Sequence, residues 1–154
     1  MAEKVIIIGG TAAGLSAASK AKRVDPSLEI TVFERSGYIS YGACGLPYFV
    51  GGIIDQPDDL VSLNVDQMTN QRGVPTFIHH EVTSIDRTAQ TVTVRDLDSG
   101  KSWQQPYDKL VIATGAHAIV PDIPGADAEG VYTLRTVEDG IRLKSTVHGG
   151  EHKA

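Results

Sequence analysis

The chain has 154 residues, of which 41% are apolar and 21% charged, a composition typical of a globular protein rather than a disordered or fibrous one. Its net charge of −5 argues against electrostatic binding of nucleic acid, and its single cysteine excludes an internal disulfide scaffold and a cysteine-built zinc site. The first apolar run, residues 5–8, is too short for a signal peptide or a membrane span, so we expect one cytoplasmic domain with no membrane partner.

Residues 5–34 predict one β-α-β unit. The β-branched run at 5–8 is typical of a strand that is buried on both faces of a sheet. Residues 13–24 are rich in Ala, Lys and Leu, which favour a helix, and Asp25-Pro26 ends it. A second strand is expected at 30–33. The pattern indicates an α/β fold with a parallel sheet.

The rest of the chain predicts shorter elements, with a stretch at 36–59 that is mostly loop. Helices are expected at three places: 44–50, 64–72 and 137–146. Strands are expected at four places: 76–78, 82–85, 91–94 and 110–113. A hairpin turn is expected at 98–100, and Thr136 and Asp139 resemble a capping box at the start of the last helix. This order predicts an antiparallel β-meander inserted into the parallel sheet.

The turn after the first strand has the composition of a nucleotide-binding loop. The G-x-G-x-x-G/A fingerprint maps onto Gly9, Thr11 and Gly14, with Thr11 in place of the middle glycine. The N–H groups of such a turn and the dipole of the following helix attract a diphosphate. Glu34 lies 20 residues after Gly14, where an acid accepts hydrogen bonds from adenosine ribose hydroxyls. A tight turn that binds no ligand is the alternative.

Cys44 is the candidate redox residue. It lies between Gly42 and Gly45, with Pro47 soon after, and these residues argue against a core strand. At the start of a short helix, unpaired N–H groups and the helix dipole would favour the thiolate. Because the chain has no second cysteine, the thiol would cycle through a mixed disulfide with a small thiol or through a sulfenic acid. A buried structural cysteine is the alternative.

Three segments together resemble the single-cysteine branch of the FAD-dependent pyridine nucleotide–disulfide oxidoreductases. The resemblance is strongest to coenzyme A–disulfide reductases and to related NADH oxidase-like enzymes and persulfide reductases. The segments are 4–14, then 40–48 with Gly51-Gly52, then 110–115 with 121–125. The resemblance implies a Rossmann-like FAD-binding fold.

The resemblance implies FAD as the cofactor and assigns residues to it. The FAD diphosphate would lie against Gly9, Gly10, Thr11, Ala12, Ala13 and Gly14. The remaining implied contacts are Glu34 at the ribose with Arg35 beside it, the Val82 backbone at the adenine, and Thr114 and Gly115 at the flavin. Cys44 would lie beside the flavin as the catalytic thiol.

The resemblance also implies coenzyme A (CoA) as the thiol partner. The substrate-binding residues that it implies are Ser16, Lys20, Arg23, Ser40, Ala43 and Arg72. Lys20 would meet a phosphate as a point charge, and Ala43 stands where the family commonly has Asn. Ala12 stands where oxygen- and peroxide-reducing relatives carry His, which favours a thiol or disulfide substrate.

The resemblance implies further domains that this sequence lacks. Residues 1–154 are expected to be the FAD-binding domain, and 137–154 the start of a connection to NAD(P)H-binding and dimerisation domains. The complete enzyme would use NAD(P)H and form a homodimer, so this chain is expected to be incomplete as an enzyme.

Three other interpretations remain open. The first is an NADH oxidase or peroxidase that cycles Cys44 through sulfenic acid. The second is a non-catalytic flavin- or nucleotide-binding module that needs a partner chain, and the third is a Rossmann-like domain without flavin. No metal site is expected, because the adjacent His79 and His80 would point to opposite faces of a strand.

Overall fold

The structure is a computed structural model that describes residues 2–149. The contacts of the chain divide these residues into two compact units. The first unit contains residues 2–41 and 63–115, and the second contains residues 42–62 and 116–149. The residues predicted to begin a connection to a further domain fall partly in the second unit, and 150–154 lie outside the described residues.

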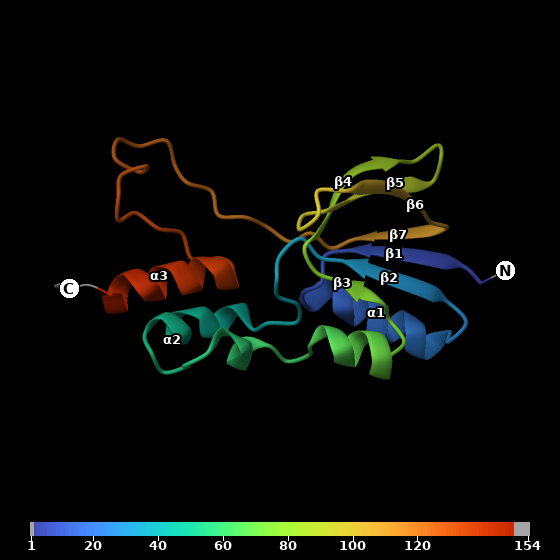
Figure 1. Ribbon diagram of the computed structural model, residues 1–154, viewed down its shortest axis with the longest axis horizontal. Helices are drawn as coiled ribbons and strands as arrows, with labels where there is room; N and C mark the ends of the chain where they lie inside the picture. The colour runs from blue at the N-terminus through green and yellow to red at the C-terminus, as the bar shows by residue number, and fades with distance from the viewer. Residues whose placement is uncertain (1, 150–154) are drawn as a thin grey trace. The chain divides into compact units, whose positions relative to one another are not determined.

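Four parallel strands form the main sheet of the first unit (Figure 1). In order across the sheet they are β3 (Thr76–Phe77), β2 (Glu29–Phe33), β1 (Lys4–Ile8) and β7 (Lys109–Ile112). β1 is paired on both sides, with Ile6 opposite Thr31 of β2 and Leu110 of β7. α1 (Ala12–Val24) joins β1 to β2 and covers one face of the sheet, as the sequence predicts.

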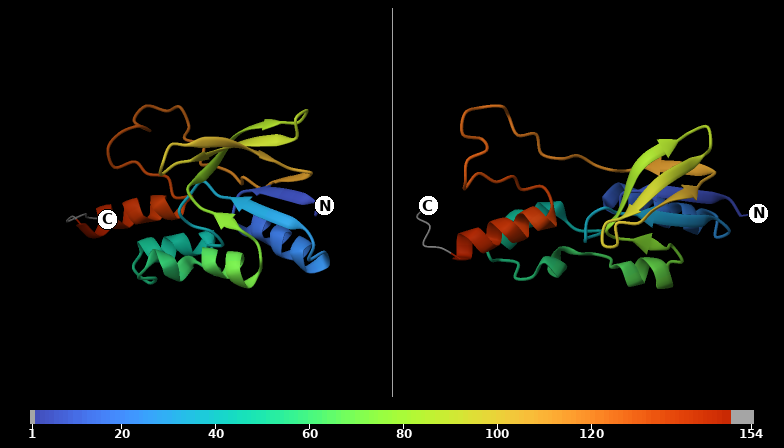
Figure 2. Two further views of the ribbon diagram at one scale, coloured as in Figure 1. Left: turned by 45° about the vertical axis from the view of Figure 1, so that its right-hand side comes forward. Right: turned by 45° about the horizontal axis from the view of Figure 1, so that its top comes forward.

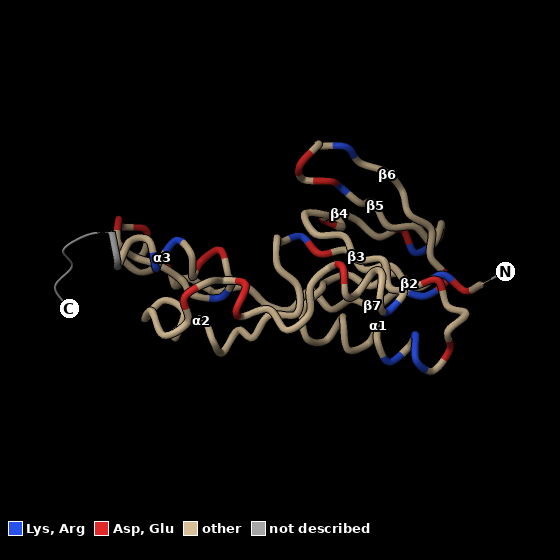
Figure 3. Tube along the Cα trace, turned by 60° about the horizontal axis from the view of Figure 1, so that its bottom comes forward, with Lys and Arg blue, Asp and Glu red and all other residues tan. Residues whose placement is uncertain are grey.

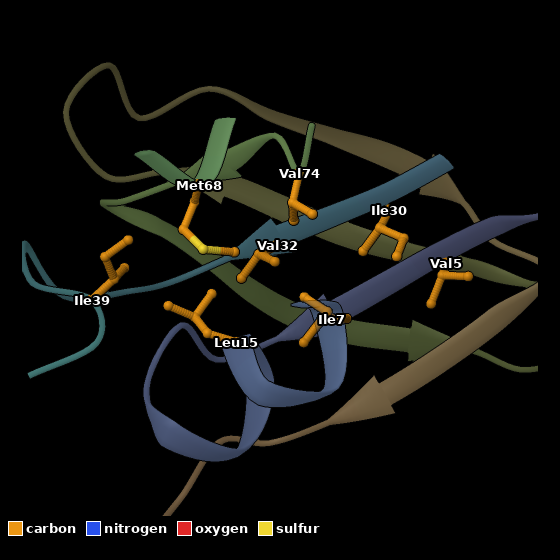
Figure 4. Close-up of a cluster of buried hydrophobic side chains, with 9 residues drawn as sticks. Val5, Ile7, Leu15, Ile30, Val32, Ile39, Met68 and Val74 are labelled. Carbon is orange, nitrogen blue, oxygen red and sulfur yellow. The ribbon is translucent and has the colours of Figure 1, made fainter. Parts of the chain in front are cut away.

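The two faces of this sheet bury different apolar clusters. Strand residues pack against α1 on one face (Figure 4), in a cluster of Val5, Ile7, Leu15, Ala18, Ile30, Val32, Ile39, Met68 and Val74. Ile6, Ile8 and Phe33 point to the other face, where they pack against Val92 and Val94. Successive side chains of a strand alternate between faces, so a sheet that is covered on both sides needs apolar residues at every position.

Three antiparallel strands cover the second face, in the order β4 (His80–Asp86), β5 (Thr91–Asp96) and β6 (Ser102–Pro106). They form the expected meander, inserted between β3 and β7, which confirms the predicted fold class. β6 was not expected, because its residues do not alternate between apolar and polar. It forms an edge strand with only β5 as its neighbour, and four of its five residues are exposed.

The predicted hairpin turn at 98–100 joins β5 to β6. The Asp96 N–H donates to the Lys101 carbonyl at 2.9 Å, and Gly100 has a φ of +73°. Hydrogen bonds from the Ser99 hydroxyl and from the backbone N–H groups of Asp98 and Ser99 hold the pKa of Asp96 below its usual value. The carboxylate of Asp96, the residue at which the turn begins, therefore fixes the turn.

Short helical elements make up the second unit. They are η1 (Ala43–Gly45), α2 (Leu46–Val50), η2 (Pro57–Leu60) and α3 (Val137–Gly149). α3 lies beside α2 in every view (Figure 2), and Leu46 and Phe49 of α2 are buried. The predicted helices near 44–50 and at 137–146 are confirmed. No helix among residues 2–149 has the length and apolar character needed to cross a membrane.

Two stretches differ in detail from the expectation. Residues 65–71, in the first unit, are helical as predicted, but five of them form the π-helical turn η3 (Gln67–Gln71). η2 lies in a stretch that was expected to be loop. Its start is fixed by Asp59, whose carboxylate accepts a hydrogen bond from the Gln56 N–H at 3.2 Å. A single turn of this kind has too few residues to show a helical period in the sequence.

The predicted capping box begins α3. Asp139 Oδ2 accepts a hydrogen bond from the Thr136 N–H at 3.1 Å, and Thr136 Oγ1 accepts one from the Asp139 N–H at 3.2 Å. We expect Thr136→Val to lower the free energy of unfolding by about 1 kcal/mol, because one helix N–H loses its acceptor. Denaturant unfolding followed by circular dichroism measures this, with the exposed Ser145→Ala on the same helix as the control. Equal losses in the two variants would contradict the prediction.

Candidate functional site

The glycine turn is closed so tightly that it excludes side chains. A Cβ atom on Gly14 would lie 1.9 Å from the Gly9 carbonyl oxygen, and one on Gly9 would lie 2.3 Å from the Ala113 carbonyl oxygen. Gly9 also has a φ of +105°, which L-residues rarely adopt. The first and last glycines of the fingerprint therefore meet a steric requirement, for the turn itself and for the packing of α1 on β1.

The N-terminus of α1 offers hydrogen-bond donors. Thr11 is its N-cap residue, but the Thr11 side chain makes no capping hydrogen bond, and the first turn holds no acidic residue. The first N–H groups of a helix have no partner within the helix, so they are available to an anion. Thr11 has a φ of −98°, which any residue adopts, so the backbone there does not require the missing middle glycine.

Glu34 is fixed beside the glycine turn. Its Oε2 accepts a hydrogen bond from the Gly10 N–H at 2.7 Å, and its Oε1 accepts one from the Ser36 N–H at 2.8 Å. Each carboxylate oxygen can accept a further bond, so the group keeps capacity for ribose hydroxyls. Arg35 is mostly exposed, and its Nη1 lies 3.9 Å from Oε1 of Glu81.

The other predicted cofactor residues lie in the first unit as well. Thr114 and Gly115 follow β7, whose carboxyl end lies beside that of β1, where the Ala113 N–H donates to the Ile8 carbonyl at 2.8 Å. Ligands of open α/β sheets bind at this edge. Val82 is in β4, opposite Val94 of β5 and next to a shift in strand register. The roles of these residues stay predictions.

Five of the six predicted substrate residues line one cavity of about 440 Å³. They are Ser16, Lys20, Arg23, Ser40 and Arg72. Three of the five are cationic, and Lys20 and Arg23 belong to the basic second half of α1 (Figure 3). A cavity of this size and charge suits an anionic small molecule.

Sequence reasoning missed Ser19 in this cavity. The Ser19 Oγ accepts a hydrogen bond from Nη1 of Arg72 at 3.0 Å, which ties the residue after η3 to α1. The signal was present in the spacing, because Ser16, Ser19, Lys20 and Arg23 follow the i, i+3, i+4, i+7 pattern of one helix face. These four positions carry no apolar residue, so they are open to a ligand.

Cys44 and Ala43 lie in the second unit, whereas the other predicted site residues lie in the first. Both are in η1, directly before α2, and the Cys44 thiol is free and exposed. This exposure contradicts the alternative of a buried structural cysteine. The short helix expected near 44–50 is present, but it begins as a 3-10 turn that contains Cys44.

The two adjacent histidines are occupied by other partners. His79 Nδ1 lies 3.1 Å from both carboxylate oxygens of Asp98, and His80 Nδ1 lies 2.6 Å from the Ile78 carbonyl. Within residues 2–149, no three His, Cys, Asp or Glu side chains are grouped so that they could hold a metal ion. The histidines therefore have structural contacts.

Three known oxidoreductases have sequences similar to this chain. Coenzyme A disulfide reductase of Staphylococcus haemolyticus is 35% identical over 136 residues, 88% of this chain and 30% of that protein. NAD(P)H coenzyme A polysulfide/persulfide reductase of Pyrococcus horikoshii is 38% identical over 94% of this chain and 31% of that protein. NADH oxidase of Enterococcus faecalis is 38% identical over 86% of this chain and 29% of that protein.

Solved structures agree with these relatives. The reduced CoADR-RHD of Bacillus anthracis matches with a TM-score of 0.92 at 34% identity, over 96% of this chain and 27% of that one. This chain therefore spans less than a third of the length of the relatives that it matches. The family model for pyridine nucleotide-disulphide oxidoreductases matches residues 3–150. The chain belongs to the pyridine nucleotide-disulphide oxidoreductase family.

Proposed function

We propose that this chain is the FAD-binding part of an NAD(P)H-dependent flavoprotein disulfide reductase. Its substrate is CoA disulfide or a related persulfide or disulfide, and Cys44 is the redox residue. The observation that carries the proposal is the cavity beside α1, where the sequence-predicted residues converge and three of them are cationic. Relatives named for CoA disulfide and for CoA polysulfide or persulfide reduction support the same substrate class.

The glycine turn fits the diphosphate of FAD. Gly9 and Gly14 leave room only for backbone, and α1 presents an uncapped N-terminus. Glu34, held by two backbone N–H groups, has the place and the acceptors for the ribose. When bound, FAD would supply the electron pair taken from NAD(P)H, whereas the chain supplies binding and orientation.

The exposed Cys44 thiol supplies the sulfur chemistry. As a thiolate, it attacks one sulfur of a disulfide R–S–S–R, forms the bond Cys44–S–S–R and releases one thiolate RS⁻. Two electrons then break the mixed disulfide, a second thiolate leaves and the Cys44 thiolate is restored. Protonation of the two leaving thiolates completes the balance, so each disulfide takes up two electrons and two protons.

The cavity supports a preference for CoA over simple thiols. CoA carries several phosphate charges, and Lys20, Arg23 and Arg72 are the cations that line the cavity. A charge-assisted hydrogen bond is worth about 1.5–3 kcal/mol. Because each 1.4 kcal/mol changes a Kd tenfold, we expect Arg72→Gln to weaken CoA binding about 10- to 100-fold.

Titration calorimetry with CoA and with pantetheine, which has no phosphate, tests this expectation. Pantetheine affinity should not change in Arg72→Gln. Arg87→Gln, at an exposed turn after β4, is the control for loss of one positive charge. Unchanged CoA affinity in Arg72→Gln, or an equal loss in Arg87→Gln, would contradict the assignment of this cavity.

A second candidate function is an NADH oxidase that cycles Cys44 through sulfenic acid, since a 38% identical relative is named NADH oxidase. The mass of the chain purified without reductant separates the two. A CoA-sized adduct that reductant removes and that is absent in Cys44→Ser supports the disulfide reductase. An oxygen-sized adduct on Cys44 supports the oxidase.

A further inference from the structure

The backbone on both sides of Cys44 rests against other parts of the second unit. The Gly42 N–H donates to the Leu60 carbonyl at 2.9 Å. A Cβ atom on Gly45 would lie 2.5 Å from Cδ2 of Leu60 and 3.5 Å from Cδ1 of Ile54. The two glycines that flank Cys44 therefore lie against Leu60 and, at Gly45, near Ile54.

Ile54 belongs to a hydrogen-bonded segment that we call the hook, residues 46–55. The hook consists of α2 and the loop that turns back on it. The N–H groups of Ile53 and Ile54 both donate to the Tyr48 carbonyl, at 2.9 and 3.2 Å. These two bonds fix the start of the loop that turns back on α2. They do not involve the carbonyl groups of Ile54 and Asp55 at the end of that loop.

Lys144 of α3 holds the end of the hook. Its Nζ donates to the Ile54 carbonyl at 3.0 Å and to the Asp55 carbonyl at 2.8 Å. The same ammonium lies 4.3 Å from the centroid of the Phe49 ring, within the range of a cation–π contact. Because the Ile54 side chain also lies beside Gly45, within 3.5 Å of the place that a Cβ atom would take, one lysine bears on the residue next to Cys44.

Gly140 allows α3 to come close enough for these bonds. It lies one turn before Lys144, on the same face of the helix. A Cβ atom there would lie 3.2 Å from Cδ2 of Leu46 and 3.2 Å from Cδ1 of Phe49. Both side chains are buried, so they have little freedom to yield. α3 is thus seated on the hook at two points.

We propose that Lys144 is a positioning residue for Cys44. It keeps the hook closed and so aims the thiolate along the line needed to attack one sulfur of a CoA-type disulfide. This inference rests on the proposed function, in which that attack forms the Cys44–S–S–R bond and releases RS⁻. A misplacement of about 1 Å can lower a reaction rate about 100-fold. A lysine that is far from Cys44 in the sequence therefore affects the preference of Cys44 for CoA disulfide.

The test uses the single cysteine of the 154-residue chain as its own reporter. Mass spectrometry follows the rates at which Cys44 forms a mixed disulfide with CoA disulfide and with the small neutral hydroxyethyl disulfide, and its alkylation by iodoacetamide. In Lys144→Met we expect the CoA-to-hydroxyethyl rate ratio to fall about 10- to 100-fold. Alkylation should be unchanged, because the thiol stays exposed, and Lys144→Arg should restore most of the ratio.

Arg142→Met is the matched control, because it removes from the same helix a cation whose guanidinium contacts Asp139 and the Tyr132 ring instead of the hook. An unchanged ratio in Lys144→Met, an equal fall in Arg142→Met, or alkylation that changes in parallel with both disulfides would overturn the inference. If Lys144→Met does not fold, Gly140→Ala, which pushes α3 away from the hook, must lower the same ratio. A wild-type chain with no preference for CoA disulfide would instead contradict the proposed function itself.

Discussion

Gly14→Ala is expected to weaken FAD binding strongly and to destabilise the first unit. The new Cβ would lie 1.9 Å from the Gly9 carbonyl oxygen and 3.2 Å from Cγ2 of Ile7. The nearer atom belongs to the backbone, so α1 must move away from β1. Overpacking of this kind costs about 1–3 kcal/mol, and we expect the Kd for FAD to rise by at least about 100-fold, because the diphosphate site is built by that packing.

Flavin fluorescence titration gives the Kd, and denaturant unfolding gives the stability. Gly100→Ala is the matched control, since its Cβ would meet no atom within 4 Å and its position lies in the hairpin turn. Because Gly100 has a φ of +73°, an alanine there lowers the stability of the chain without affecting FAD binding. Tight FAD binding by Gly14→Ala, or an equal loss of binding in Gly100→Ala, would be incompatible with this account of the glycine turn.

Cys44→Ser is expected to stop electron transfer to a disulfide without affecting FAD binding. The FAD-loaded chain is reduced by light without oxygen, CoA disulfide is added, and absorbance near the flavin maximum follows reoxidation. In the wild type each flavin should yield two CoA thiols. The variant should react at least about 100-fold more slowly, since a serine hydroxyl cannot form a mixed disulfide.

The FAD affinity of Cys44→Ser is the internal control, because the substitution replaces one exposed sulfur atom by oxygen and leaves the glycine turn and Glu34 unchanged. Reoxidation by CoA disulfide at the wild-type rate would show that Cys44 takes no part. Reoxidation by peroxide rather than by CoA disulfide, with loss in Cys44→Ser, would favour the oxidase.

The regular part of the fold could be predicted from the sequence because its signals are local. The β-branched runs of β1 and β7 and the small residues of the turn between β1 and α1 each predict their own structure. β6 was missed because an exposed edge strand needs no apolar alternation, and its pairing with β5 alone defines it. The division of the chain into two units could not be predicted, since it depends on contacts between α2 and α3, far apart in sequence.

The candidate site likewise contains residues that could be predicted from the sequence and one that could not. The resemblance alone implied Ser16, Lys20 and Arg23, and the structure brings them to one cavity. Lys144 could not be predicted, because 90 residues separate it from the Ile54 carbonyl that it holds. A lysine on a helix gives no signal that its ammonium binds backbone carbonyls rather than solvent.

Native mass spectrometry of the purified chain shows directly whether the chain binds FAD. We expect the native spectrum to show one FAD per chain after incubation with the cofactor, and the denatured spectrum to show the chain without it. The same measurement on Gly14→Ala should show far less bound FAD. A folded wild-type chain that takes up no FAD at saturating concentration would contradict the assignment of the glycine turn and Glu34 to FAD.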